Sequence, residues 1–94
     1  LVEISAPAYN VGIHAIRLKN ITADSVAAFG TSASTVEYVQ NRSYIKCKIT
    51  TTVSTTFEVQ HQCQFSNSLD GLGVATGFSG MTEVFTTVYL QQVE

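Results

Sequence analysis

The chain has 94 residues, of which 45% are hydrophobic and 13% charged, and its seven acidic and five basic side chains give a net charge of −2. This length allows one compact domain, and the composition is too apolar and too weakly charged for a disordered chain. The basic residues form no run that could follow a phosphate backbone, so we expect no nucleic-acid partner. Apolar runs such as residues 26–29 are short, whereas a membrane helix needs roughly twenty residues, so we expect no membrane span.

The composition favours strands. The chain contains 12 Thr, 11 Val and 9 Ser residues, and Thr and Val fit the pleated surface of a sheet better than a helix. A weakly charged all-β chain has to manage its sheet edges, and assembly with other copies is one way to cover them. The chain begins at Leu1 rather than Met, so we expect these residues to be one module, either part of a longer polypeptide or a processed product.

The first clear strand spans residues 11–21, where His14, Ile16 and Leu18 alternate with Ala15, Arg17 and Lys19. Residues 22–25 are typical of a turn, and the apolar residues 26–29 predict a short buried strand before Gly30. Residues 31–35 are small and polar and are expected to form a loop.

The next strand spans residues 43–50, with Ile45, Cys47 and Ile49 on one face and Lys46 and Lys48 on the other. The longest alternation is in residues 57–65, where Phe57, Val59, His61, Cys63 and Phe65 alternate with Glu58 and three glutamines. Residues 66–80 are rich in glycine and predict a long, ordered loop, and residues 81–93 predict a closing strand. We therefore expect an all-β protein, an antiparallel β-sandwich of jelly-roll type with five to seven short strands. Its expected core contains Ile16, Leu18, Ile45, Ile49, Phe57, Val59 and Phe65.

A few side chains are candidates for catalysis, metal binding or disulfide formation. His14 and His61 occupy inward strand positions and are interpreted as core histidines, although a metal site with Cys63 is compatible with their spacing. The carboxylates are scattered along the chain and indicate solvation rather than acid–base chemistry. Cys47 and Cys63 lack the paired spacing of a zinc site, and either one disulfide or two free thiols fits their pattern. The sequence therefore predicts no catalytic residue, metal or cofactor.

Aromatic and apolar residues in loops and strands predict a contact surface. The absence of Trp weakens a sugar-binding interpretation, and low charge with aromatic enrichment favours a seam between subunits. The residues expected at such a seam or surface-binding site are Tyr38, Tyr44, Leu72, Phe78 and Tyr89.

The chain has a family resemblance that six segments carry in order: residues 14–22, 30–32, 42–43, 57–63, 70–75 and 83–90. It resembles the β-sandwich modules near the C-termini of tail-fibre and related virion structural proteins of tailed bacteriophages, especially marine ones. The resemblance implies a non-enzymatic module on the extracellular virion, often homotrimeric, in a tail fibre, a head fibre or a capsid decoration. Its partners would be further copies, other virion proteins and host-surface glycans. The alternatives are a carbohydrate-binding module of a secreted protein and, less favoured, a small hydrolase that depends on His61.

Overall fold

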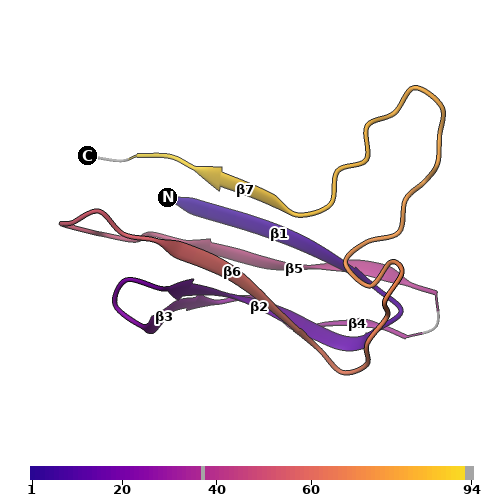
Figure 1. The fold of residues 1–94 in the computed structure, drawn as a ribbon, viewed down its shortest axis with the longest axis horizontal. Coiled ribbons are helices and arrows are strands. Elements are labelled where there is room, and N and C mark those ends of the chain that lie inside the picture. The colour runs from indigo at the N-terminus through magenta and orange to yellow at the C-terminus, as the bar shows by residue number, and fades with distance from the viewer. Residues whose placement is uncertain (37, 93–94) are drawn as a thin grey trace.

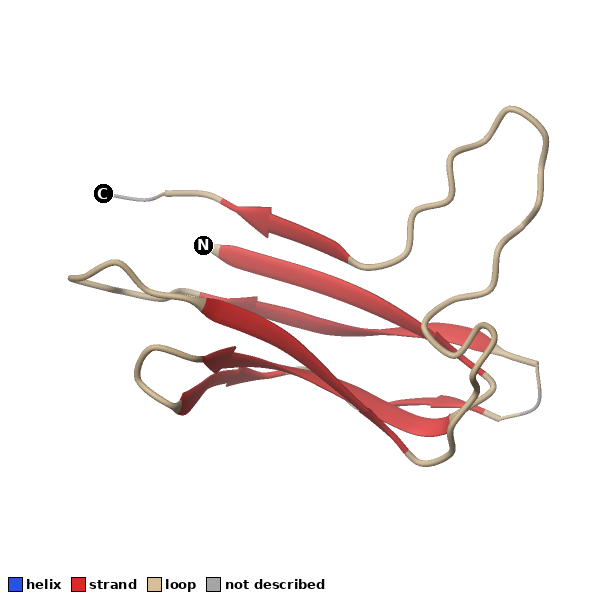
Figure 2. Ribbon diagram, viewed as in Figure 1, coloured by secondary structure: helices blue, strands red, loops and turns tan. Residues whose placement is uncertain are grey.

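The computed structural model describes residues 1–36 and 38–92, and across them the chain is an all-β sandwich of two antiparallel sheets (Figures 1 and 2). One sheet has the strand order β5-β1-β7, and the other has β2 in its centre, with β3 and β4 along one edge of β2 and β6 along the other. The strands are β1 (Val2–Tyr9), β2 (Gly12–Asn20), β3 (Ser25–Phe29), β4 (Ala33–Thr35), β5 (Gln40–Cys47), β6 (Phe57–Cys63) and β7 (Thr87–Leu90). The expected class, a sandwich of five to seven short strands, is confirmed. None of the described residues forms a helix that is long and apolar enough to cross a membrane.

The centre of the first sheet is β1, which lies outside the strands expected from the sequence. It pairs with β5 over its whole length, from Val2↔Cys47 to Tyr9↔Gln40. Its inward side chains, at every second position from Val2 to Ala8, are all buried. Small alanines and a proline weaken the strand signal of this segment, because neither is typical of a strand interior.

Pro7 explains why β7 is shorter than the strand expected over residues 81–93. Leu1 and Gln91 form a pair in which each backbone nitrogen donates to the carbonyl oxygen of the other residue. Because every second residue of an antiparallel strand bonds to the same neighbour, the N–H groups of Glu3 and Ser5 also face β7. The next N–H on that side would come from Pro7, which has none, and the β1–β7 pairing ends at Ser5↔Thr87. Residues 81–86 are consequently loop, and Val93 lies outside the described residues.

Arg42 holds the chain where this pairing ends. Its guanidinium donates hydrogen bonds from Nη1 to the carbonyl oxygen of Phe85 (2.9 Å) and to Oγ of Ser5 (2.9 Å). A side chain of β5 therefore supplies the donor that Pro7 cannot.

The core lies between β1, β2 and β5 and contains Val2, Ile4, Ala6, Ile16, Leu18 and Ile45. The predicted burial of Ile16, Leu18 and Ile45 is confirmed. Ile49, Phe57 and Val59 pack against this core but are only partly buried. The expected burial of Phe65 is wrong: it follows the end of β6 and is 62% exposed.

Two further expectations for residues 26–35 are corrected. The strand expected at residues 26–29 is β3, but it is an edge strand, so Val26 and Ala28 are partly buried and Phe29 is exposed. The loop expected at residues 31–35 contains β4, where the buried hydroxyl of Thr35 donates to the carbonyl oxygen of Gly12 (3.0 Å) and accepts from Val11 N–H (2.9 Å). Satisfying two backbone groups at the start of β2 makes a polar residue suitable for this buried position.

The long connection from β6 to β7 has a fixed first part and an exposed remainder. Near its start, the Asn67 amide donates to the carbonyl oxygen of Tyr9 (3.2 Å) and to the Asp70 carboxylate (2.7 Å). Further on, the Glu83 carboxylate accepts from the backbone N–H (2.7 Å) and hydroxyl (2.9 Å) of Thr76, and these bonds lower the pKa of Glu83 below its ordinary value. This second part extends away from both sheets before the chain returns to β7 (Figure 1).

One side of the sandwich is closed by the segment that crosses from β3 to β4. Gly30 N–H donates to the carbonyl oxygen of Ile16 (2.7 Å), and Thr31 N–H donates to that of Tyr44 (3.0 Å). The Ser43 hydroxyl of β5 accepts from Ile16 N–H (3.1 Å) and donates to the carbonyl oxygen of Thr31 (2.5 Å). These bonds connect β2 to β5 and fix the relative position of the two sheets.

Gly30→Ala is expected to destabilise this closed side by about 1–3 kcal/mol, the cost of overpacking a tight site. A Cβ at this position would lie 2.7 Å from Ile16 Cγ1 and 2.8 Å from both the Ile16 carbonyl oxygen and Ser43 Oγ. Urea unfolding of the variant measures the change, and Gly77→Ala is a useful comparison because its Cβ would meet nothing within 4 Å. Gly77 has a φ of +69°, so its loss reports backbone strain alone. An unchanged urea midpoint for Gly30→Ala would contradict the close packing around Gly30.

Candidate functional site

The side of the sandwich opposite Gly30 is open. A groove of about 550 Å³ lies there between the two sheets. Leu18, Phe57 and Val59 line it from the β2–β6 sheet, and Val2, Val88 and Leu90 line it from the β1–β7 sheet. Val88 is 53% exposed and Leu90 is 70% exposed, so the groove continues the core to the surface without a cover.

Both strands that flank this groove have an unpaired edge. On β6, Gln64 N–H donates to Ile13 and Ile21 N–H donates to Thr56, so the even-numbered residues of β6 hydrogen-bond to β2. The N–H and C=O groups of the odd-numbered residues, Val59 and His61 among them, therefore point to the open side. By the same alternation, the groups of Val88 and Leu90 point away from β1. Within the described residues no hydrogen bond joins β6 to β7.

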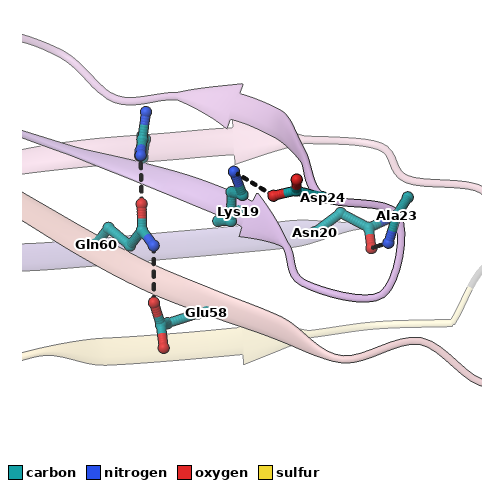
Figure 3. Close-up of polar contacts among 7 residues, drawn as sticks. Lys19, Asn20, Ala23, Asp24, Glu58 and Gln60 are labelled. Atoms are coloured by element: carbon teal, nitrogen blue, oxygen red, sulfur yellow. Dashed lines mark hydrogen bonds and ion pairs between the residues drawn. The ribbon is translucent and has the colours of Figure 1, made fainter.

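Part of the outer face of β2 and β6 carries linked polar side chains (Figure 3). Gln60 accepts from Arg17 Nε (2.6 Å) and donates to the Glu58 carboxylate (2.7 Å). At the nearby turn, Lys19 pairs with Asp24 at 3.0 Å. These polar contacts face solvent, whereas the groove on the open side is lined mainly by apolar side chains.

The aromatic and apolar residues expected at a seam are all exposed but do not form one cluster. Tyr44 and Tyr89 lie on the outer face of the β5-β1-β7 sheet, where β1 separates them. Leu72 and Phe78 lie in the long connection, and Tyr38 has a φ of +60° and its ring centroid is 6.5 Å from that of Tyr9. Sequence reasoning missed Leu90 and Val2 as groove residues, since no pattern reveals which strands become sheet edges.

The disulfide considered between Cys47 and Cys63 is not formed, and both thiols are free. Cys47 pairs with Val2 at one end of β5, whereas Cys63 pairs with His14, whose side chain contacts Asn41 near the other end of β5. Six strand positions from Asn41 to Cys47 correspond to about 20 Å at roughly 3.3 Å per residue. The Cys63 thiol instead donates to the carbonyl oxygen of Phe65 (3.2 Å).

Inside the sandwich, His14 and His61 form a hydrogen-bonded pair. The His14 Nδ1 to His61 Nε2 distance is 2.8 Å, and the His14 Nε2 to Asn41 Oδ1 distance is also 2.8 Å. The Asn41 amide NH₂ donates to the carbonyl oxygen of Ser34, so Asn41 Oδ1 accepts from His14 Nε2–H. His14 Nδ1 is then an acceptor, His61 Nε2 is the donor to it, and His61 Nδ1 carries the free lone pair.

This arrangement commits both ring nitrogens of His14. The metal site considered for His14, His61 and Cys63 is not assembled, and no group of three His, Cys, Asp or Glu side chains within residues 1–36 and 38–92 is placed to hold a metal ion. His61 and Cys63 both line a small pocket of about 190 Å³ beneath the start of the long connection. In this structure the histidine pair can accept a proton at one free site, His61 Nδ1.

The histidine pair is expected to make stability depend on pH. Burial lowers the pKa of His61, and the neighbouring His14 lowers it further. A histidine whose pKa is lower when folded binds its proton more readily when unfolded, so its contribution is complete above pH 6.5 and is lost as the pH falls through the folded-state pKa. Urea unfolding at about pH 7.5 and pH 5.5 should show lower stability at the acid value, by at most about 1.4 kcal/mol per pH unit for one proton.

His61→Gln is the control for this pH dependence, because it keeps a hydrogen-bond donor and removes the titrating group. The variant is expected to lose most of the difference between the two pH values. A variant with the same pH dependence as the unmodified chain would assign the effect to other groups.

Comparison with protein-family models, with curated proteins and with solved structures finds no match for this chain.

Proposed function

We propose that this chain is a non-enzymatic structural or adhesive module of a bacteriophage virion, in a tail fibre, head fibre or capsid decoration, that acts through assembly with further copies. The observation that supports assembly is the open side of the sandwich. Its apolar groove and two unpaired strand edges are the kind of surface that partners cover, because unpaired edges and contiguous apolar patches promote association. The virion setting rests on the sequence resemblance.

A small sandwich benefits from such assembly. A chain of this size buries a modest fraction of its surface on folding, and many of its large hydrophobic side chains in the second half are exposed. Association buries further apolar surface and stabilises the folded state by mass action. A homotrimer is the form we favour.

Light scattering across a hundredfold concentration range tests the proposal. A particle with three times the chain mass of 10.2 kDa that persists on dilution is the expected result. A chain that remains folded and monomeric at every concentration would contradict it.

A second candidate, glycan binding, is favoured by the placement of Tyr44 and Tyr89. Both are exposed on one outer sheet face and flank the polar residues Glu3 and Ser5 of β1. Exposed tyrosine rings can stack on sugars, so a glycan array followed by titration of Tyr89→Ala tests this candidate. Saturable binding that weakens in the variant, but not in Tyr38→Ala on a separate surface, would support it. Absence of binding to any glycan would argue against it.

A further inference from the structure

We propose that the free edge of β6 in one copy pairs with the free edge of β7 in the next, so that neighbouring copies close each other's open side in a head-to-tail ring. This inference rests on the proposed assembly function and adds the two strands through which assembly occurs.

The first argument is the state of these two edges. Sheet edges are usually protected by lysine, proline, inward-pointing charges or bulges. Neither β6 nor β7 contains any of these: β6 carries one charged residue, Glu58, on its outer face, and β7 carries none. The edge strand β3 is different, because a register shift at Leu18 and Lys19 interrupts its pairing with β2. β6 is thus a regular, open edge, and β7, although only four residues long, carries no charge, proline or register shift that blocks pairing.

The second argument is that β6 and β7 of one chain do not satisfy each other. They flank the groove of about 550 Å³, and the hydrogen bonds around Gly30 and Ser43 fix the sheets from the opposite side. The outward N–H and C=O groups of Val59 and His61 and of Val88 and Leu90 need partners from outside the chain or from water.

The third argument selects another copy of the chain as the partner. Pairing β6 with β7 of a neighbour places no like charges opposite each other, because β7 carries no charge, and it brings a second copy to the rim of the groove that Val59 and Val88 line. Pairing β6 with β6 leaves every β7 edge unsatisfied. A β6–β7 contact satisfies both edges with one type of interface, and such heterologous interfaces form closed rings when the rotation closes.

Proline substitutions at outward-facing N–H groups test the pairing. Val59→Pro and Val88→Pro each remove one N–H from a free edge and leave the bonds to β2 and β1 in place, and edge strands tolerate such a change. Val59→Ala and Val88→Ala are the matched controls, because they shorten the same side chains and keep the N–H groups. Mass is measured by light scattering over a hundredfold concentration range, with far-UV circular dichroism to verify folding.

Each Pro variant is expected to need about tenfold more protein for half-assembly than its Ala control. Equal assembly of the Pro and Ala variants would overturn the strand pairing but leave the assembly function intact. An effect of Val59→Pro without one of Val88→Pro would show β6 pairing with itself and would also overturn the inference. A monomeric unmodified chain would overturn both proposals.

Hydrogen exchange of the unmodified protein provides a test that needs no substitution. The amides of Val59, His61, Val88 and Leu90 should exchange slowly in the assembled protein and rapidly after dilution to monomer. Gln60 and Tyr89, whose amides face β2 and β1, should stay protected in both states. Rapid exchange at Val59 and Val88 in the assembled protein would contradict the pairing even if a proline variant failed to fold.

Discussion

His14→Ala is expected to lower the free energy of unfolding by about 3–5 kcal/mol, among the largest effects of any single substitution in this chain. The His14 side chain is 1% exposed and sits at the middle of a hydrogen-bonded series from Asn41 to His61. Its removal leaves a cavity and also leaves His61 Nε2 and Asn41 Oδ1 without their partner. Both effects destabilise the folded state, and urea unfolding at neutral pH measures their sum.

His61→Ala is the matched comparison. His61 is only partly buried, at the open side, so water can replace part of what is lost, and the expected cost is about 1–2 kcal/mol. The double variant should cost less than the sum of the two single variants, because the shared hydrogen bond is counted in both. Equal costs for the two single variants would contradict the assignment of His14 as the buried member of the pair.

The strands with a clear period of two were predictable from the sequence. Residues 14–18 alternate strictly, and the structure buries His14, Ile16 and Leu18 on one face of β2. The same pattern identified β5 and β6, because alternation reflects a sheet with one covered face. Whether a segment forms a strand depends largely on its own residues, so the local sequence pattern can predict it.

The depth of burial was not predictable in the same way. β6 has the longest alternation in the chain but becomes an edge strand, so Phe57 and Val59 are only partly buried. β1 has a weak pattern but becomes the centre of its sheet. Whether a strand is central or at an edge depends on its neighbours in space, which alternation does not encode.

The candidate site depends on the same non-local information. The groove lies between β6 and β7, which are 23 residues apart in the chain, and β7 begins only at Thr87 because the residue that would face Phe85 on β1 is Pro7. A sequence of Thr, Val and aromatic residues at positions 81–90 cannot reveal a proline on its partner strand. The histidine pair is similar: the 47 residues between His14 and His61 are bridged only by the β2–β6 register, Ile16↔His61 and His14↔Cys63.

Ile16→Ala is expected to cost about 2–5 kcal/mol, more than Phe57→Ala, although phenylalanine is the larger side chain. Ile16 is 2% exposed at the centre of β2 and belongs to the buried cluster, whereas Phe57 is only partly buried at the rim of the open groove. A cavity at Ile16 stays empty, but a gap at Phe57 is open to water. Under the sequence-based expectation of a buried Phe57, its loss would cost about 3–5 kcal/mol.

The difference in cost between Ile16→Ala and Phe57→Ala should also depend on assembly. In the monomer, at low protein concentration, Ile16→Ala should be the more destabilising variant by urea unfolding. At concentrations where copies associate, the groove is covered and the cost of Phe57→Ala should increase, because the lost side chain then leaves a dry cavity. The cost of Ile16→Ala should not change with concentration beyond the experimental error. A Phe57→Ala cost that exceeds that of Ile16→Ala in the monomer would contradict the open groove, since it would require Phe57 to be fully buried within a single chain.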